Sequence, residues 1–254
     1  MSNVNIADKL EYVAYNIPRI YEQGKNKGYG LGYDGGYSAN YNEFWDAFQD
    51  NGNRVTYTGA FYGLGWNDVT FKPKYPLKPT GSINNMFRES NINDMTLAID
   101  ELDFTNVTTA SYPFRYCNVT KLPKIIIGAN METHGFLVDV QKLQVINELN
   151  FPNADLPYST NIYYCYDLQE ANVSGVIKKT ISFKDSANLT TEDAINTIMH
   201  LKDYGIEEGM PNLYKHTITL HADVWARLDA LGGDVSPFGD SWKEYCVDLG
   251  WNVA

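Results

Sequence analysis

The feature that most constrains this chain is a degenerate motif that recurs between residues 87 and 171. Each copy has an aromatic residue, a small or aromatic residue three positions later, an aliphatic residue two after that, and an apolar residue three further on. Two clear copies and one looser copy are Phe87–Met95, Phe114–Leu122 and Tyr163–Ala171. A weaker copy between them contributes Val138, Val140 and Leu143. Because one such unit cannot bury its apolar face alone, the motif predicts a solenoid of stacked units.

The spacing of the copies is typical of a leucine-rich solenoid. Their aliphatic positions, at intervals of 27, 21 and 28 residues, are Ile92, Val119, Val140 and Leu168. The segment Leu102–Asn106 also recurs as Leu149–Asn153, about two units later, and each predicts a short strand followed by an asparagine turn. The alternative is chance patterning in a chain that is 44% hydrophobic. A solenoid presents an extended surface, so this interpretation favours binding or scaffolding.

Residues 1–75 are predicted to form a helical attachment region. Apolar spacings of three and four predict helices over residues 4–26 and 40–51, joined by a glycine- and tyrosine-rich loop at 28–37. The second helix carries a dense aromatic face, formed by Tyr41, Phe44, Trp45 and Phe48. That face packs either on the same chain or on a neighbouring subunit. The loop is a candidate contact surface through Tyr29, Tyr33 and Tyr37, because tyrosine offers amphipathic area at low entropy cost.

The remaining chain divides into a repeat domain and a cap. Three prolines at 71–81 predict an extended linker, and the repeat domain is assigned to 76–188. Residues 189–254 are predicted to cover the last open face of the solenoid. The expected elements are a helix from Thr190 to Leu201, a strand over His216–His221, a helix over Ala222–Leu231, a helix capped by Ser241 and a final strand at Trp251–Val253.

Charge and composition exclude several partners. The net charge of −11 argues against nucleic-acid binding and against binding to anionic membranes. The sequence has no run of about 18 apolar residues and no secretory signal at its beginning, so membrane insertion is not expected and synthesis in a reducing cytoplasm is. Cys117 and Cys165 lie in the motif and are predicted to be core thiols.

The sequence holds no recognisable catalytic or cofactor motif. The four histidines, which show no metal-ligand spacing, are His134, His200, His216 and His221. His216 and His221 are expected on opposite faces of one strand. Gly28, Gly30 and Gly32 lack a preceding strand, so a phosphate site is a poor match. We therefore predict a protein that is not an enzyme, with no catalytic residues, no metal and no cofactor.

Two parts of the chain resemble known families. The motif in Phe114–Leu122 resembles the BspA-like leucine-rich repeat of bacterial surface proteins and phage structural proteins. Four earlier segments are similar to a module of prophage and gut-phage virion proteins, and these are Asn16–Lys25, Phe44–Arg54, Gly65–Asp68 and Phe71–Pro76. The resemblance implies an α+β fold in which a short, irregular BspA-like leucine-rich-repeat solenoid lies between the helical attachment region and the α/β cap.

The same resemblance implies a function in the virion. We expect a non-enzymatic phage structural protein of the tail fibre, baseplate or capsid surface, made in the host bacterial cytoplasm. Its expected partners are other virion proteins, further copies of itself in a homo-oligomer such as a trimer, and a host surface glycan or protein. Two alternatives remain: a bacterial BspA-like surface adhesin and a glycan-active tail-fibre enzyme.

Overall fold

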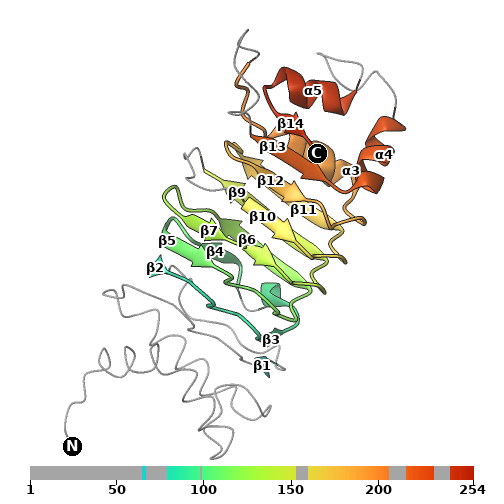
Figure 1. Cartoon of the computed structure of the whole chain (residues 1–254). Helices are drawn as coiled ribbons and strands as arrows, with labels where there is room; N and C mark the ends of the chain where they lie inside the picture. The colour runs from blue at the N-terminus through green and yellow to red at the C-terminus, as the bar shows by residue number, and fades with distance from the viewer. Residues whose placement is uncertain (1–64, 67–78, 98, 153–159, 206–215, 232–240) are drawn as a thin grey trace, which may run out of the picture.

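The computed structural model describes residues 65–66, 79–97, 99–152, 160–205, 216–231 and 241–254, which build a parallel β-solenoid of about four turns (Figure 1). One side holds β2 (Thr80–Ser82), β5 (Asn106–Ser111), β7 (Glu132–His134), β8 (Leu137–Val138), β10 (Thr160–Tyr163) and β12 (Ile181–Phe183). The other side holds β3 (Asn91–Ile92), a 3-10 helix η1 (Met95–Leu97), β4 (Glu101–Asp103), β6 (Lys121–Ile126), β9 (Val145–Phe151) and β11 (Glu170–Gly175). All strand pairs within the described residues are parallel, which is the pairing that a stacked coil produces.

The core forms where equivalent apolar residues of successive turns stack. Phe114, Val119 and Leu122 are fully buried, as the motif predicts. The rings of Phe87 and Phe114 stack with centroids 5.3 Å apart, and Phe136 meets Phe114 edge-on at 6.0 Å. Each aromatic residue therefore completes its burial against the neighbouring turn, and no single unit could form this core alone.

The correspondence between the two predicted strand segments is confirmed. Leu102 pairs in register with Ile125, and Ile125 pairs with Leu149, so Leu102 and Leu149 lie two turns apart in one buried column. The predicted asparagine turn is wrong at Asn106, which is the first residue of β5, and the one predicted at Asn153 lies outside the described residues. The turn is made by Asp103, whose Oδ1 accepts hydrogen bonds from the Thr105 backbone N at 3.1 Å and from Thr105 Oγ1 at 2.7 Å.

The register of the weaker copies also needs correction. Lys121 pairs with Val145, which places Leu143, and not Val140, beside Val119 in the aliphatic column. In the looser copy, Ile162 is buried against Leu137, whereas Tyr166 points outward with 48% of its surface exposed. The cause is a variable corner: one residue lies between Cys117 and Val119, and two lie between Cys165 and Leu168.

The C-terminal elements lie as the sequence predicts. They are α3 (Thr191–Met199), β13 (Thr217–Leu220), α4 (Ala222–Asp229), α5 (Trp242–Asp248) and β14 (Asn252–Val253). Thr190 and Ser241 cap their helices by accepting from the backbone N of Asp193 and Glu244. His216 and His221 flank β13 and do not lie on its two faces, since His221 caps α4.

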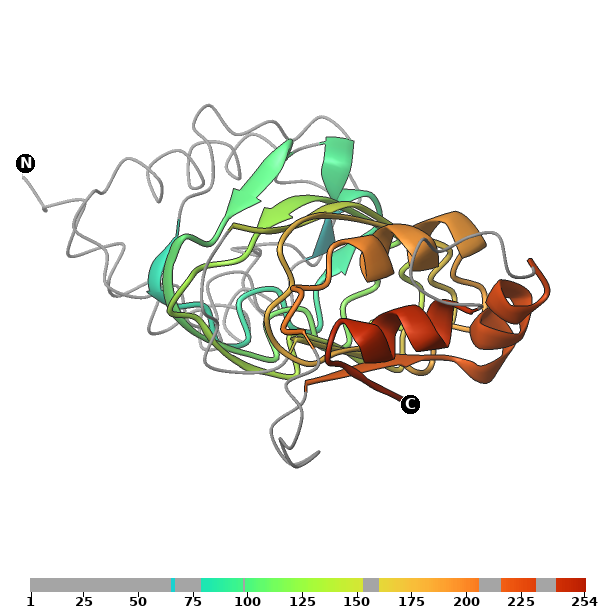
Figure 2. The ribbon, with the colours of Figure 1, turned by 90° about the horizontal axis from the view of Figure 1, so that it is seen from above.

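These elements close one end of the coil. α3 packs on β11, where the next strand of that side would lie, and β13 and β14 extend the opposite sheet (Figures 1 and 2). Within the described part of the chain, no helix is long and apolar enough to cross a membrane.

The N-terminal predictions lie largely outside the described residues. This holds for the helices at 4–26 and 40–51 and for the loop at 28–37. Two details change the predicted linker at 71–81. Thr80 and Gly81 already belong to β2, so the solenoid begins before the linker was expected to end. β1 (Gly65–Trp66) pairs with β3, which brings a segment that precedes the linker against the coil. The division into three domains stays a prediction.

Candidate functional site: a ladder along one corner of the solenoid

The most distinctive surface of the molecule is the corner that joins its two sides. Four corner residues adopt the left-handed conformation with φ between 57° and 59°, and these are Glu89, Tyr116, Asp139 and Tyr164. Each directly precedes a small buried residue, as Tyr116 precedes Cys117 and Tyr164 precedes Cys165. This conformation costs a non-glycine residue about 1–2 kcal/mol. The chain nevertheless carries large or charged side chains at all four corners.

The corner residues of successive turns stack through the backbone. Tyr116 N donates to Asp139 O, and Asp139 N donates to Tyr163 O, both at 3.1 Å. In the next turn Asp185 accepts from Tyr164 N through its carboxylate, at 2.9 Å. The result is one row along the solenoid in which acids and tyrosines alternate, in the order Glu89, Tyr116, Asp139, Tyr164 and Asp185.

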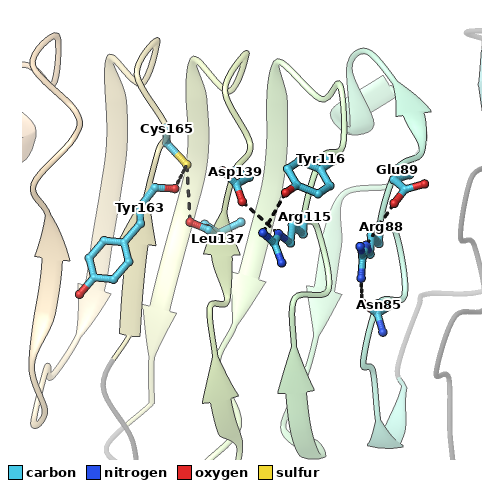
Figure 3. Close-up of polar contacts among 9 residues, drawn as sticks. All are labelled: Asn85, Arg88, Glu89, Arg115, Tyr116, Leu137, Asp139, Tyr163 and Cys165. Carbon is cyan, nitrogen blue, oxygen red and sulfur yellow. Dashed lines mark hydrogen bonds and ion pairs between the residues drawn. The ribbon is translucent and has the colours of Figure 1, made fainter.

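A second row of cations lies one residue earlier in the chain (Figure 3). Arg115 donates from Nε to Asp139 Oδ2 at 3.0 Å and from Nη2 to the Tyr116 hydroxyl at 2.8 Å. Burial acts to lower the pKa of Arg115, but the hydrogen bonds and charge interactions with Asp139 and Tyr116 together outweigh it and leave the pKa raised. Arg88 pairs with Glu89 at 3.3 Å in the preceding turn. We call these two rows together the corner ladder: Arg88, Glu89, Arg115, Tyr116, Asp139, Tyr164, Lys184 and Asp185.

The cations also contact the tyrosine rings. The Arg115 guanidinium lies 4.6 Å from the centroid of Tyr116 and 4.9 Å from that of Tyr112. Lys184 Nζ lies 4.4 Å from the ring of Tyr163 and 5.7 Å from that of Tyr164. Cation–π contacts of this kind fix the orientation of exposed rings. The rings are therefore held in place and remain open to solvent, with exposed fractions of 45% for Tyr116 and 40% for Tyr164.

The corner ladder is electrically balanced on an acidic protein. Its cations are Arg88, Arg115 and Lys184, and its acids are Glu89, Asp139 and Asp185. The net charge of the whole chain is −11. A surface of paired charges and fixed aromatic rings is suited to recognition of a ligand through stacking and hydrogen bonds.

A column of small residues supports the corner from inside. Ser90 Oγ lies 3.1 Å from Cys117 Sγ, and Ser186 Oγ donates to Cys165 O at 3.2 Å. The three cysteines are free and buried, as predicted for Cys117 and Cys165. Burial raises the pKa of the Cys165 thiol to about 12, so it acts as a packing residue.

The site residues predicted from the sequence lie elsewhere. Tyr41, Phe44, Trp45 and Phe48, like Tyr29, Tyr33 and Tyr37, lie outside the described residues, so their docking and contact roles stay predictions. Sequence reasoning missed the corner ladder. A usable signal was present, since an acid or a tyrosine precedes the small buried residue in every turn, as in Asp139–Val140 and Asp185–Ser186.

Neither a metal site among the described residues nor a match to a known protein helps to assign a function. Among the residues that the structure describes, no group of three or more His, Cys, Asp or Glu side chains could hold a metal ion. Comparison of the chain with family models, curated proteins and solved structures finds no match. The fold and the corner ladder are thus the observations on which a function can be argued.

Proposed function

We propose that this protein is a non-enzymatic recognition or assembly component of a bacteriophage virion, which presents the corner ladder to its partner. The observation that carries the recognition role is the row of exposed, immobilised tyrosines that alternate with ion-paired carboxylates. Its place on a tail fibre, baseplate or capsid surface rests on the sequence resemblance to BspA-like repeats and phage modules.

The rigidity of the surface supports a binding role. The backbone N of each of the four corner residues donates to the next turn: Glu89, Tyr116 and Asp139 donate to backbone carbonyl oxygens, and Tyr164 donates to the Asp185 carboxylate. A preorganised surface loses little conformational entropy when a partner binds. The corner can therefore bind a partner without a conformational change.

Antibody labelling of phage particles tests the virion assignment. Gold-labelled antibody against the chain should mark one fixed position on intact particles, and soluble wild-type protein should compete with the particles for host cells or for the assembly partner. Soluble protein with Tyr116→Ala and Tyr164→Ala should compete poorly. Unlabelled particles would refute the virion assignment, and a bacterial cell surface labelled instead would favour the adhesin.

The attachment role of residues 1–75 needs a separate test. Removal of 1–60 keeps β1 and its pairing with β3, whereas removal of 1–75 deletes β1 as well. Both truncated chains should be missing from assembled particles if the aromatic helix face attaches the protein. Normal incorporation of the chain lacking 1–60 would show that attachment lies elsewhere.

A further inference from the structure

The spacing of the corner ladder indicates an elongated ligand. Tyr116 and Tyr164 occupy equivalent corners two turns apart, with Asp139 between them. Neighbouring strands are about 4.7–4.9 Å apart, so the two rings are displaced by roughly 10 Å along the solenoid. A partner that uses both rings must therefore extend along the coil and present flat apolar faces at intervals.

The polar groups beside the rings indicate hydroxyl groups on that partner. The carboxylates of Glu89, Asp139 and Asp185 only accept hydrogen bonds, and Arg115 only donates them. A sugar hydroxyl both donates and accepts, so it can satisfy either group. A proline-rich peptide also docks on aromatic rows, but its prolines lack N–H donors and would add no hydrogen bond to the carboxylates.

The charges of the protein favour a neutral ligand over a charged one. A polyanion is repelled by a protein of net charge −11. A polycation would have to displace the cations that already contact the rings and acids, since Arg115 covers Tyr116 and pairs with Asp139. A neutral chain is not repelled by the net charge, and it can stack on the exposed part of each ring without taking the place of a cation.

We propose that the corner ladder binds an unbranched neutral glycan laid along the solenoid, with sugar faces on Tyr116 and Tyr164 and hydroxyl groups on Asp139 between them and on the flanking carboxylates of Glu89 and Asp185. This inference rests on the proposed recognition function and names the chemistry of the partner. Binding is non-covalent and leaves the glycan intact.

A glycan array probed with the labelled full chain tests the proposal. The array holds neutral and charged oligosaccharides, with heparin, polylysine and a proline-rich peptide beside them. The chain should select neutral, unbranched glycans. Binding should change little between about 0.1 M and about 1 M NaCl, over which the Debye length falls from about 10 Å to about 3 Å. Selection of a charged polymer or of the peptide, or no neutral glycan bound, overturns the proposal.

Variants then locate the binding site. Tyr116→Ala and Tyr164→Ala should each weaken binding about tenfold, while Tyr164→Phe, which keeps the ring, should bind nearly as wild type. Met199→Ala is the matched control, because Met199 is 54% exposed on α3, away from the corner. Circular dichroism checks that each variant is folded. Unchanged binding by folded alanine variants would refute the assignment.

A negative result in the glycan array and a negative result in the particle experiment refute different claims. If no neutral glycan binds while the soluble protein still competes with particles, the recognition function stands with another partner and the glycan inference is wrong. If neutral glycans bind through the tyrosines but particles carry no label, the glycan inference stands and the virion assignment is wrong.

Discussion

At the scale of single residues, the fold depends on side chains that complete their burial in the next turn. Phe114 is the clearest example, because it stacks on Phe87 of one neighbouring turn and meets Phe136 of the other. Its removal therefore empties space between three turns at once. This makes the aromatic column a sensitive test of the stacked core.

We expect Phe114→Ala to lower the free energy of unfolding by about 3–5 kcal/mol, the usual range for deletion of a buried aromatic side chain. Phe114→Leu, which refills much of the space, should cost clearly less. Chemical denaturation of both variants measures the difference. A near-zero change for the alanine variant would contradict the stacked-core interpretation.

Two glycines separate backbone conformation from close packing. Gly175 and Gly205 both have positive φ, at 83° and 65°. A Cβ at Gly175 would lie 1.9 Å from Phe151 O, whereas one at Gly205 would meet nothing within 4 Å. Gly175 is therefore required both by its backbone conformation and by its close packing, whereas Gly205 is required by its backbone conformation alone.

Gly205→Ala should cost about 1–2 kcal/mol, from the left-handed conformation alone. Gly175→Ala should cost about 1–3 kcal/mol more, because the β11 and β9 backbones must move apart. Thermal melting of the two variants gives the comparison. Equal destabilisation would show that the approach of Gly175 to Phe151 is not a real constraint.

At the scale of elements, the outer face of β6, β9 and β11 is joined by a polar cluster around Glu148. Lys124 Nζ lies 3.3 Å from Glu148 Oε2, and Ser174 Oγ donates to Glu148 Oε1 at 2.5 Å. The hydrogen bond from Ser174 and the contact with Lys124 lower the pKa of Glu148, although burial opposes them. One carboxylate thus ties three strands together.

This cluster makes a pH dependence predictable. A carboxylate whose folded pKa lies below its ordinary 4.5 stabilises the fold fully above that pH, and the contribution is lost as the pH falls through the folded pKa. Wild type should therefore lose more stability between about pH 5 and pH 3 than Glu148→Gln. Urea denaturation over this range measures it, with Glu170→Gln, an exposed carboxylate of β11, as the control. Parallel pH profiles for wild type and Glu148→Gln would rule out the coupling.

The elements that sequence reasoning predicted well are those specified locally. Thr190 and Ser241 mark the starts of α3 and α5, and they could be predicted because the residues of a helix cap lie within four positions of one another in the sequence. The register of Val140 was misassigned because the corners differ in length, and only pairing across turns fixes which residue joins a column. The corner ladder was missed for the same reason, since Tyr116 and Asp139 become neighbours only when the turns stack.

At the scale of the whole molecule, the two ends of the coil differ. The C-terminal end is covered by α3 and by the strands β13 and β14. At the other end, β1 contributes two residues beside β3, and β2 is the outermost described strand of its sheet. Because unpaired strand edges favour association, we expect a second copy to dock at this end.

We therefore expect a homo-oligomer that assembles through the N-terminal part of the chain, and a trimer by analogy with phage fibres. Closed symmetry is the usual outcome when one surface meets copies of itself. The aromatic residues Tyr41, Phe44 and Trp45 would supply apolar area at this contact. Light scattering on the purified chain should give a mass near three times 28.7 kDa, and the chain lacking 1–60 should be a monomer. A mass near 28.7 kDa at all concentrations would mean that the solenoid closes its own first end.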